Sequence, residues 1–143
     1  MPSRGVELRT GRLLLRPISL DDFPEILAYS QDEEWGQYTP DPKPYTRRFG
    51  EEFVARMVLA QWETAARFSI VLDGGVVGGV GLEIDSTNQV AELAYSLARE
   101  HWGKGLASEA CRCVIGWGFR DLGLEKVYAR TDLRNVRSSR VMG

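Results

Sequence analysis

The chain has 143 residues, of which 43% are apolar and 27% are charged, and its formal net charge at pH 7 is -2. This length and composition are typical of one globular domain with a substantial core. The near-neutral charge argues against a general nucleic-acid binder. No apolar run is long enough to span a membrane, and residues 1–7 lack the apolar core of a signal peptide.

The N-terminal part of the chain predicts a strand followed by a helix. After a loose lead-in over residues 1–7, we expect a strand over Arg12–Ile18. Ser19 has a side chain typical of a helix N-cap, and two acidic residues follow in what would be the first turn. The sequence therefore predicts a helix that begins after Ser19 and ends near Ser30.

The segment Gln31–Tyr45 contains three prolines and should form a loop. It includes an acidic run and two aromatic residues, Asp32, Glu33, Glu34, Trp35 and Tyr38. Two interpretations of the acidic run stay open, because it could be a solvated loop or a rim that attracts a cationic amine.

Thr46–Ala66 is the longest segment with helical periodicity. Its apolar residues recur at spacings of three and four, which is typical of a helix face that packs on a core. That face holds Phe49, Phe53, Met57, Ala60 and Gln61 or Trp62.

Three strands should follow this helix, over Phe68–Leu72, Val76–Ile84 and Val90–Ala98. The first two are joined by Asp-Gly-Gly, a strong turn signal. Three glycines, Gly78, Gly79 and Gly81, lie inside the second of these strands. Glycines within a strand weaken it and often mark a bulge or the close approach of another backbone.

A glycine-rich loop connects Val90–Ala98 to the next helix, with Gly103 and Gly105 two residues apart. The first N–H groups of a helix lack partners inside the helix and attract negative charge, and glycines let the backbone come close to a ligand. The spacing matches neither the dinucleotide fingerprint nor the phosphate loop of nucleotide hydrolases. An anion cradle and an ordinary strand-to-helix loop are both compatible with this segment taken alone.

The helix after this loop has an apolar stripe at Ala107, Ala110, Cys111, Val114 and Gly118. Gly123 can end it in a left-handed turn. A fifth strand should cover Lys126–Thr131, and Asn135 can cap a last helix. The element order predicts an α/β fold with a mixed sheet, in which the fourth and fifth strands, Val90–Ala98 and Lys126–Thr131, form a right-handed parallel pair.

The two cysteines, Cys111 and Cys113, lie two apart on a predicted helix and so point in different directions. A disulfide between them is not expected, and two cysteines with a single histidine make a poor metal site. We expect reduced thiols in a cytoplasmic protein and no bound metal.

Four stretches in the same order resemble the GCN5-related N-acetyltransferases (GNAT), in particular the Rim-type branch that acetylates ribosomal-protein N-termini. Trp102-Gly103-Lys104-Gly105-Leu106-Ala107-Ser108-Glu109-Ala110 resembles the acyl-CoA motif. The others are Arg12–Pro17, Ala91–Leu97 and Asn135–Met142, which resemble the opening strand, the fourth strand and the start of the last helix.

The resemblance implies a GNAT fold, mostly antiparallel, with flanking helices and a fourth and fifth strand that splay apart to admit the pantetheine arm of acetyl-CoA. It implies a single acetyltransferase-like domain over residues 1–143 that lacks the C-terminal end of the family pattern. The sequence departs from that pattern at Glu100, where the superfamily usually has Gln or Arg, and at Met142, where a tyrosine acid is frequent. An early end would expose the edge of the fifth strand, which suggests a homodimer through that edge.

The glycine loop is suited to hold the phosphates of the cofactor, and the resemblance adds the fourth strand and the last helix as contacts for its other parts. The expected cofactor-binding residues are Tyr95, Ser96, Leu97, Gly103, Lys104, Gly105, Leu106, Ala107, Ser108 and Asn135. Lys104 could equally be a solvated lysine, and Asn135 a plain helix cap.

An ammonium group must lose a proton before it can attack a thioester, and a carboxylate is a usual means. Glu92 is the first candidate for this base and Glu83 the second, although either could be a solvent-facing acid of the sheet. By resemblance to the Rim-type branch, Ser138 is the candidate acid for the departing thiolate. His101, the only histidine, lies on the phosphate side and is a weaker candidate base.

The sequence thus predicts an N-acetyltransferase that moves an acetyl group from acetyl-CoA to a primary amine, either a protein N-terminus or a small amine. Two alternatives remain, a CoA-binding or interaction module of the same fold without catalysis, and an unrelated α/β interaction domain. The expected partners are the amine substrate and a second copy of the chain, with no nucleic acid and no membrane.

Overall fold

The structure is a computed structural model that describes residues 6–32 and 45–129, and the statements below concern these residues. The strands are β1 (Leu8–Arg9), β2 (Leu14–Pro17), β3 (Ala65–Leu72), β4 (Gly75–Asp85), β5 (Val90–Leu97) and β6 (Lys126–Tyr128). The helices are η1 (Leu20–Asp22), α1 (Phe23–Ser30), α3 (Arg47–Leu59), η2 (Arg99–His101) and α4 (Leu106–Asp121).

The six strands form one sheet in the order of the sequence, β1 to β6. Neighbours are antiparallel except for β5 and β6, which are parallel and are joined by the crossover helix α4. The predicted α/β class, the mostly antiparallel sheet and the parallel pair are confirmed. Because β1 adds a strand that was not predicted, the expected fourth and fifth strands are β5 and β6.

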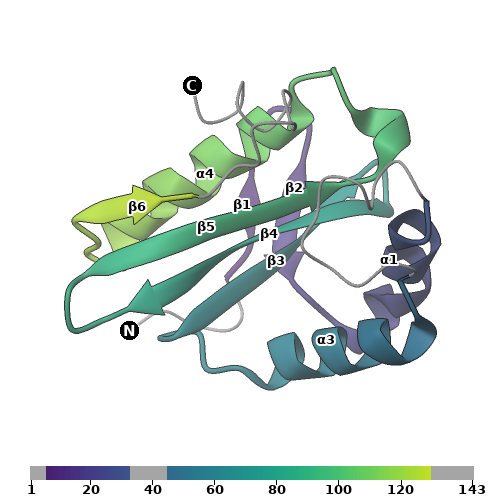
Figure 1. The fold of residues 1–143 in the computed structure, drawn as a ribbon. Helices are drawn as coiled ribbons and strands as arrows, with labels where there is room; N and C mark the ends of the chain where they lie inside the picture. The colour runs from purple at the N-terminus through teal and green to yellow at the C-terminus, as the bar shows by residue number, and fades with distance from the viewer. Residues whose placement is uncertain (1–5, 33–44, 130–143) are drawn as a thin grey trace.

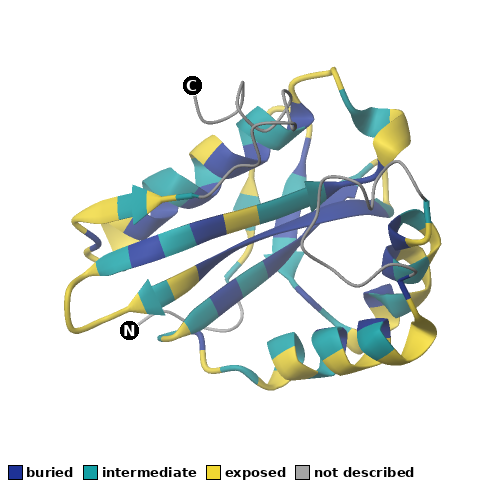
Figure 2. Cartoon of the chain, viewed as in Figure 1, coloured by how far each residue is buried: buried dark blue, intermediate teal, exposed yellow. Residues whose placement is uncertain are grey.

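Helices cover both faces of the sheet, with α4 against one face and α1 and α3 against the other (Figure 1). The larger core cluster joins α4 to residues that alternate along β3, β4 and β5, including Phe68, Val80 and Leu93. Burial accordingly changes from residue to residue along β5 (Figure 2). A smaller cluster lies under α1 and α3, around Val54 and Val71.

The N-terminal helix begins as predicted. Ser19 caps η1, and the Asp22 carboxylate accepts a hydrogen bond from the Ser19 backbone N–H at 2.9 Å. Asp22 is buried and is paired with Arg16 at 2.7 Å. Pro24 lies in the first turn of α1, where its missing N–H costs no helical hydrogen bond.

The predicted strand over Arg12–Ile18 is too long, because it begins only at Leu14. Its first residues belong to a tight turn, in which the Thr10 N–H donates to the Leu13 carbonyl at 2.9 Å. Leu8 and Arg9, which precede this turn, pair with Leu15 and Leu14 as the short strand β1.

The predicted helix over Thr46–Ala66 is also too long. Thr46 caps α3 as expected, but the helix ends at Leu59 and β3 begins at Ala65. The indole ring of Trp62 belongs to the core on the opposite side of the sheet, 4.9 Å from Phe68 between ring centroids. A continuing helix would keep Trp62 on the α3 side, so the chain must leave the helix before it.

Only part of the expected apolar stripe of α3 is a core face. Phe53 and Met57 pack against the smaller cluster, whereas the fully buried positions of the helix are Gly50 and Val54. The stripe predicted for α4 is confirmed at Ala110, Cys111, Val114 and Gly118, which are buried together with Leu106 and Trp117.

The glycines of β4 do mark close approaches. A Cβ atom at Gly78 would lie 2.2 Å from the Ser96 carbonyl oxygen, and one at Gly81 would lie 2.4 Å from that of Ala66. At Gly79 the neighbour is a side chain, since a Cβ there would lie 2.6 Å from the Arg67 guanidinium. The β3–β4 ladder also has an irregularity between Ile70 and Val71.

Within residues 6–32 and 45–129, no helix is both long and apolar enough to cross a membrane. Over the same ranges, no three His, Cys, Asp or Glu side chains gather where a metal ion could bind. Cys111 and Cys113 are free thiols.

Candidate acetyl-CoA and acceptor site

The loop before α4 has the backbone geometry of an anion cradle. Gly103 and Gly105 both have positive φ, at 81° and 77°, a conformation that favours glycine. Gly105 is the N-cap of α4, and no side chain caps this helix. The N–H groups of Leu106, Ala107 and Ser108 precede the first helical hydrogen bond, which Glu109 donates to the Gly105 carbonyl. The helix therefore presents uncapped donors beside a glycine turn.

The N-terminal segment holds this loop in place. The Arg12 guanidinium donates to the Glu109 carboxylate at 2.8 Å and to the Lys104 carbonyl at 2.9 Å. The Thr10 hydroxyl also donates to Glu109. Hydrogen bonds from Thr10 and then from Arg12 hold the pKa of Glu109 below its ordinary value, despite partial burial. The carboxylate in the first turn of α4 therefore stays ionised, and its charge is balanced by the paired Arg12 guanidinium, which limits its repulsion of an anion at the same helix end.

Trp102 connects the loop to the end of β5. Its indole N–H donates to the Leu97 carbonyl at 2.7 Å, and its ring packs against the larger core cluster. The loop and the last residue of β5 therefore hold a fixed relative position.

Among the described residues, only the first part of β5 is paired on the edge that faces away from β4. In the part of the chain described here, β6 pairs with β5 at Val90, Ala91 and Glu92 and at no later residue. The Ala98 N–H donates to the Val77 carbonyl, toward β4. Since backbone groups alternate along an antiparallel strand, those of Tyr95 and Leu97 face the opposite edge. The part of this edge beyond Glu92, which no described residue pairs with, is called the open edge below, and the splay of the two strands stays a prediction.

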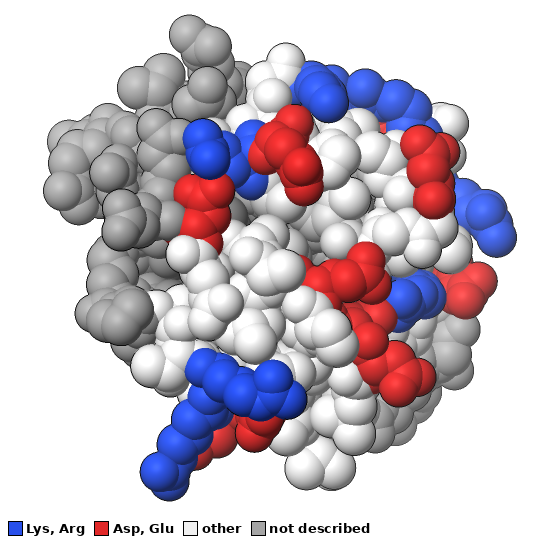
Figure 3. All heavy atoms as spheres, turned by 90° about the vertical axis from the view of Figure 1, so that its right-hand side faces the viewer, with Lys and Arg blue, Asp and Glu red and all other residues white. Residues whose placement is uncertain are grey.

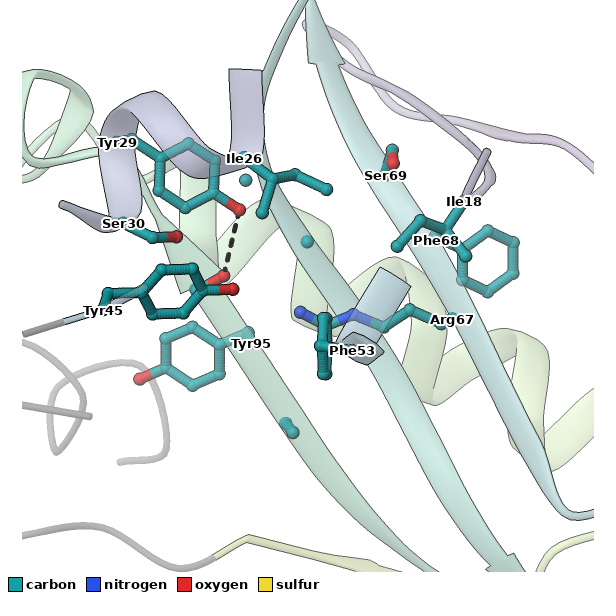
Figure 4. Close-up of a pocket in the computed structure, with 14 residues that line it drawn as sticks. Ile18, Ile26, Tyr29, Ser30, Tyr45, Phe53, Arg67, Phe68, Ser69 and Tyr95 are labelled. Atoms are coloured by element: carbon teal, nitrogen blue, oxygen red, sulfur yellow. Dashed lines mark hydrogen bonds between the residues drawn. The ribbon is translucent and has the colours of Figure 1, made fainter. Parts of the chain in front are cut away.

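A cavity of about 220 Å³ lies between the sheet and the helices α1 and α3 (Figure 4). Its walls come from α1, α3, the strands β3, β4 and β5, and two residues outside these elements, Ile18 and Tyr45. They are Ile18, Ile26, Tyr29, Ser30, Tyr45, Phe53, Arg67, Phe68, Ser69, Gly78, Gly79, Ala94, Tyr95 and Ser96. Because β5 contributes Ala94, Tyr95 and Ser96, one strand borders both this cavity and the open edge.

The two candidate bases are direct neighbours across β4 and β5, where Glu83 pairs with Glu92. Glu83 is exposed and Glu92 is half-buried. Both lie on the same sheet face as Ala94 and Ser96, because side chains two residues apart along a strand share a face. The sheet therefore places Glu92 one step along β5 from the cavity, and Glu83 one strand further away.

Of the remaining residues predicted to bind the cofactor or to act in catalysis, some are described by the structure and others are not. Lys104 is exposed and Ser108 is half-buried at the start of α4, while the Ser96 hydroxyl lies 3.5 Å from that of Tyr29 on the cavity side. Asn135 and Ser138 lie outside the described residues, as does Met142.

The acidic run is described only at Asp32, whose carboxylate is paired with Arg99 at 2.8 Å. Glu33 and Glu34 lie outside the described residues, with Trp35 and Tyr38. Acidic and basic side chains are interspersed on the face that carries α1 (Figure 3). The rim for a cationic amine stays a prediction.

His101 is part of η2, with little of its side chain exposed. Its Nε2 atom lies 3.9 Å from the Glu100 carboxylate, and its buried Nδ1 atom has no hydrogen-bond partner in the described structure. η2 comes between β5 and the glycine loop, so His101 is on the loop side of the site, as expected.

Sequence reasoning missed Arg12, Glu109 and Arg67 as residues that shape the site. Glu109 carries the one signal that was available, an acid in the first turn of a helix. Arg12 and Arg67 act across strands and loops distant in sequence, which no local pattern indicates.

Comparison with known proteins agrees with this geometry. Residues 12–143 match the family described as Acetyltransferase (GNAT) domain. The chain is 35% identical over 140 residues to the uncharacterized N-acetyltransferase p20 of Bacillus licheniformis, covering 94% of this chain and 78% of that protein. It is 34% identical over 77 residues to the spermidine N(1)-acetyltransferase of Escherichia coli K12, covering 53% of this chain and 41% of the relative.

Solved structures share the fold. A GNAT-family acetyltransferase from Bacillus anthracis superposes with a TM-score of 0.84 at 24% identity, over 96% of this chain and 80% of that one. RimL, a ribosomal L7/L12 alpha-N-protein acetyltransferase solved with coenzyme A, superposes with a TM-score of 0.85 at 18% identity, over 95% and 80% of the two chains. The chain therefore belongs to the GNAT family and is an acetyltransferase that uses acetyl-CoA.

Proposed function

We propose that this enzyme transfers the acetyl group of acetyl-CoA to a primary amine, a peptide N-terminus or a small amine, by direct attack. One observation supports this most strongly. In the described residues, β5 contacts the glycine loop through Leu97 and Trp102, has an edge without a paired strand beyond Glu92, and lines the cavity with Ala94 and Ser96. A donor held at the loop and an acceptor held in the cavity would thus meet along one strand.

The residues of the loop fit the phosphates of acetyl-CoA. Apart from its chain neighbours, no atom of the described residues lies within 4 Å of a Cβ placed on Gly103, and the donors of α4 are uncapped. Gly103, Lys104, Gly105, Leu106, Ala107 and Ser108 would hold the phosphates there, mostly through backbone N–H groups. Bound acetyl-CoA supplies an activated thioester.

The open edge of β5 fits the rest of the donor. Backbone groups of Tyr95 and Leu97 face this edge, where they would bind the pantetheine arm and donate to the thioester oxygen. A donor aimed at charge that develops in a transition state is often worth about 3 kcal/mol. Ser96 would contribute from the cavity side, and Asn135, which lies outside the described residues, is retained as a cofactor contact.

Glu92 is the proposed base, directly or through a water molecule, because it shares a sheet face with the cavity and is partly shielded from solvent. Glu83 is the second choice, since it is exposed and one strand further from the open edge. The attacking nitrogen loses its proton to this carboxylate and forms a C–N bond with the acetyl carbon as the C–S bond of the thioester breaks. In our proposal the departing thiolate takes a proton from Ser138, which regains one from water.

Among amines, we favour a peptide N-terminus. The fold neighbour RimL is named for alpha-N-protein acetylation, whereas the relative named for spermidine matches just over half of this chain. An α-amino group has a pKa near 8, compared with about 10.4 for an alkylammonium, so more of it is deprotonated at neutral pH.

Steady-state assays of coenzyme A release, with the acetylated product identified by mass spectrometry, test this proposal. The panel should hold a peptide with a free N-terminus, the same peptide with a blocked N-terminus, and spermidine. We expect turnover with the free peptide and none with the blocked one. Binding of acetyl-CoA without acetylation of any amine would contradict the proposed transfer and favour a CoA-binding module.

We also propose that two copies associate through β6. In the described residues this strand is the last of the sheet, and Tyr128 on it is 38% exposed. An uncovered strand edge is a template for pairing with another chain. Sedimentation analysis should give a dimer, and a monomer over the accessible concentration range would contradict this.

A further inference from the structure

We propose that the cavity beneath α1 and α3 selects amines that carry a carboxylate, and that Arg67 is the residue that recognises it. This inference rests on the proposed transfer to an amine and names the class of acceptor.

The Arg67 side chain is held across the sheet by two glycines of β4. Arg67 lies opposite Gly81, and its guanidinium reaches Gly79, where a Cβ atom would come within 2.6 Å of it. At Gly81 a Cβ would lie 3.0 Å from the Arg67 Cδ atom. Because Gly79 and Gly81 have no side chains, the Arg67 side chain can lie across β4, with its guanidinium directed from β3 toward β5.

The guanidinium lies within the cavity and beside an aromatic ring. Its Cζ atom is 5.4 Å from the centre of the Phe53 ring, and it points from β3 toward the side of the cavity that holds Tyr29 and Tyr45 (Figure 4). A cation over an aromatic face is stabilised and is restricted in its orientation. Arg67 is therefore placed as a fixed cation rather than a mobile surface side chain.

Arg67 is the only charged residue among those that line the cavity in the described part of the chain. The other walls are apolar, or hydroxyl-bearing such as Ser69, whose hydroxyl donates to the Asp22 carboxylate at 2.7 Å. Charges interact more strongly in such surroundings than in water. A fixed cation favours an acceptor with a carboxylate and disfavours a second ammonium group, as in a polyamine.

The dimensions suit an amine and a carboxylate on one small acceptor. Gly79 is the direct neighbour of Ser96, at a strand spacing of roughly 4.8 Å, so the guanidinium beside Gly79 lies one strand away from β5. The cavity of about 220 Å³ is several times the roughly 30 Å³ that a water molecule occupies in the liquid. It can hold a carboxylate group while the amine reaches toward the open edge of β5.

The test compares two amidated tetrapeptides, Ser-Asp-Ala-Ala and Ser-Asn-Ala-Ala, which differ by one charge. A second pair, glycine and glycinamide, places the carboxylate on a small molecule instead. In the wild-type enzyme we expect kcat/KM for the acidic member of at least one pair to exceed that of its neutral partner by about tenfold or more. The pair that shows the preference identifies the source of the carboxylate.

Three variants assign the preference to Arg67. Arg67→Gln should bring the ratio within a pair close to one, and Arg67→Lys should restore part of it. Gly79→Ala should reduce the ratio by displacing the end of the Arg67 side chain, since its new Cβ meets this flexible group. Arg56→Gln is the matched control, because Arg56 also lies near the Phe53 ring, at 5.8 Å, but is exposed and outside the cavity.

Comparing ratios between variants cancels the intrinsic basicity of each amine, and acetyl-CoA affinity checks that each variant is folded. Equal rates for both members of both pairs in the wild type would overturn this inference and leave the proposed transfer standing. A preference that survives Arg67→Gln would overturn the role of Arg67. If no amine is acetylated, the proposed transfer fails, and calorimetric binding of the same pairs then decides the inference, with no tighter binding of either acidic member overturning it.

Discussion

The Arg12 guanidinium lies 2.8 Å from the Glu109 carboxylate, although 97 residues separate them. This pair joins the segment before β2 to the first turn of α4. Arg12 also donates to the Lys104 carbonyl, so it holds the glycine loop from outside. The shape of the proposed phosphate cradle therefore depends on a residue that does not belong to the loop.

Replacing Arg12 should weaken acetyl-CoA binding more than it weakens the fold. For Arg12→Gln we expect the Kd for acetyl-CoA to rise about fivefold, since the loop and the first turn of α4 each lose a hydrogen bond from the guanidinium. The free energy of unfolding should fall by no more than about 1 kcal/mol, because this ion pair is partly exposed. Calorimetric titration and urea unfolding measure the two quantities. Arg9→Gln, at an exposed arginine of β1, is the control, and an equal loss of affinity in it would contradict a specific role for Arg12.

Glu92→Gln should lower kcat by about tenfold or more, because the amide cannot accept the proton of the attacking amine. The pH profile of kcat should change as well, since a titrating group has been removed. Glu83→Gln should have a smaller effect on kcat, and its distance from the open edge makes it the matched control. Unchanged turnover in Glu92→Gln would remove this residue as the base.

Asp22→Asn should lower the free energy of unfolding by about 2–4 kcal/mol. The substitution removes the buried ion pair with Arg16 and weakens the hydrogen bond that the Asp22 side chain accepts from the Ser19 N–H at the start of η1. The carboxylate accepts hydrogen bonds from Arg16, Ser69 and the Ser19 backbone, and only 3% of its side chain is exposed. Urea unfolding at pH 7 measures this loss. A loss below about 0.5 kcal/mol, the scale of ordinary surface substitutions, would contradict it.

The same carboxylate predicts a dependence of stability on pH. Burial alone would raise the pKa of Asp22, but hydrogen bonds from Arg16 and Ser69 outweigh it and hold the pKa below its ordinary value of 3.8. Its contribution is therefore present above pH 3.8 and is lost as the pH falls through the lower, folded-state value. Unfolding of wild type and Asp22→Asn between pH 7 and pH 2.5 should show the two stabilities converging on the acid side. Parallel curves would contradict this.

The two cysteines should react slowly with thiol reagents in the folded protein. Burial raises the pKa of Cys111 to about 12, and it also raises that of the half-buried Cys113. The thiolate is the reactive form, so at pH 8 Cys111 should stay unmodified while a free thiol reacts completely. Mass spectrometry after maleimide treatment, with and without guanidinium chloride, measures this. Fast modification of Cys111 in the native protein would contradict its burial.

Local signals accounted for most of the elements. Ser19 caps η1, Thr46 caps α3, and Gly123, with φ of 68°, follows α4 as predicted. These positions depend on interactions within a few residues, which a sequence displays directly. The end of α3 depends instead on Trp62, whose burial against Phe68 and Trp117 involves elements distant in the chain. Helical periodicity cannot show on which side of a sheet such a ring will lie.

The candidate site also has features that local sequence predicts and features that depend on contacts between distant segments. The glycine loop was predicted from its own residues, and the glycines of β4 correctly indicated a close approach. The atoms that come close to them follow from register, because Arg67 faces Gly81 only in the observed β3–β4 pairing. The position of Arg67 in the cavity and the contacts of Arg12 with Glu109 and Lys104 could not be predicted. Both depend on segments that are distant in the sequence and whose pairing the sequence does not show.

We propose above that the loop before α4 binds the phosphates of acetyl-CoA. Calorimetric titration with acetyl-CoA tests it most directly, on wild type, Lys104→Glu and Lys126→Glu. Both lysines are exposed, but Lys126 pairs with Val90 at the opposite end of β5. We expect micromolar binding by wild type, a Kd raised about tenfold or more in Lys104→Glu, and little change in Lys126→Glu. No binding by the folded wild-type chain, or equal affinity in the two variants, would contradict the account.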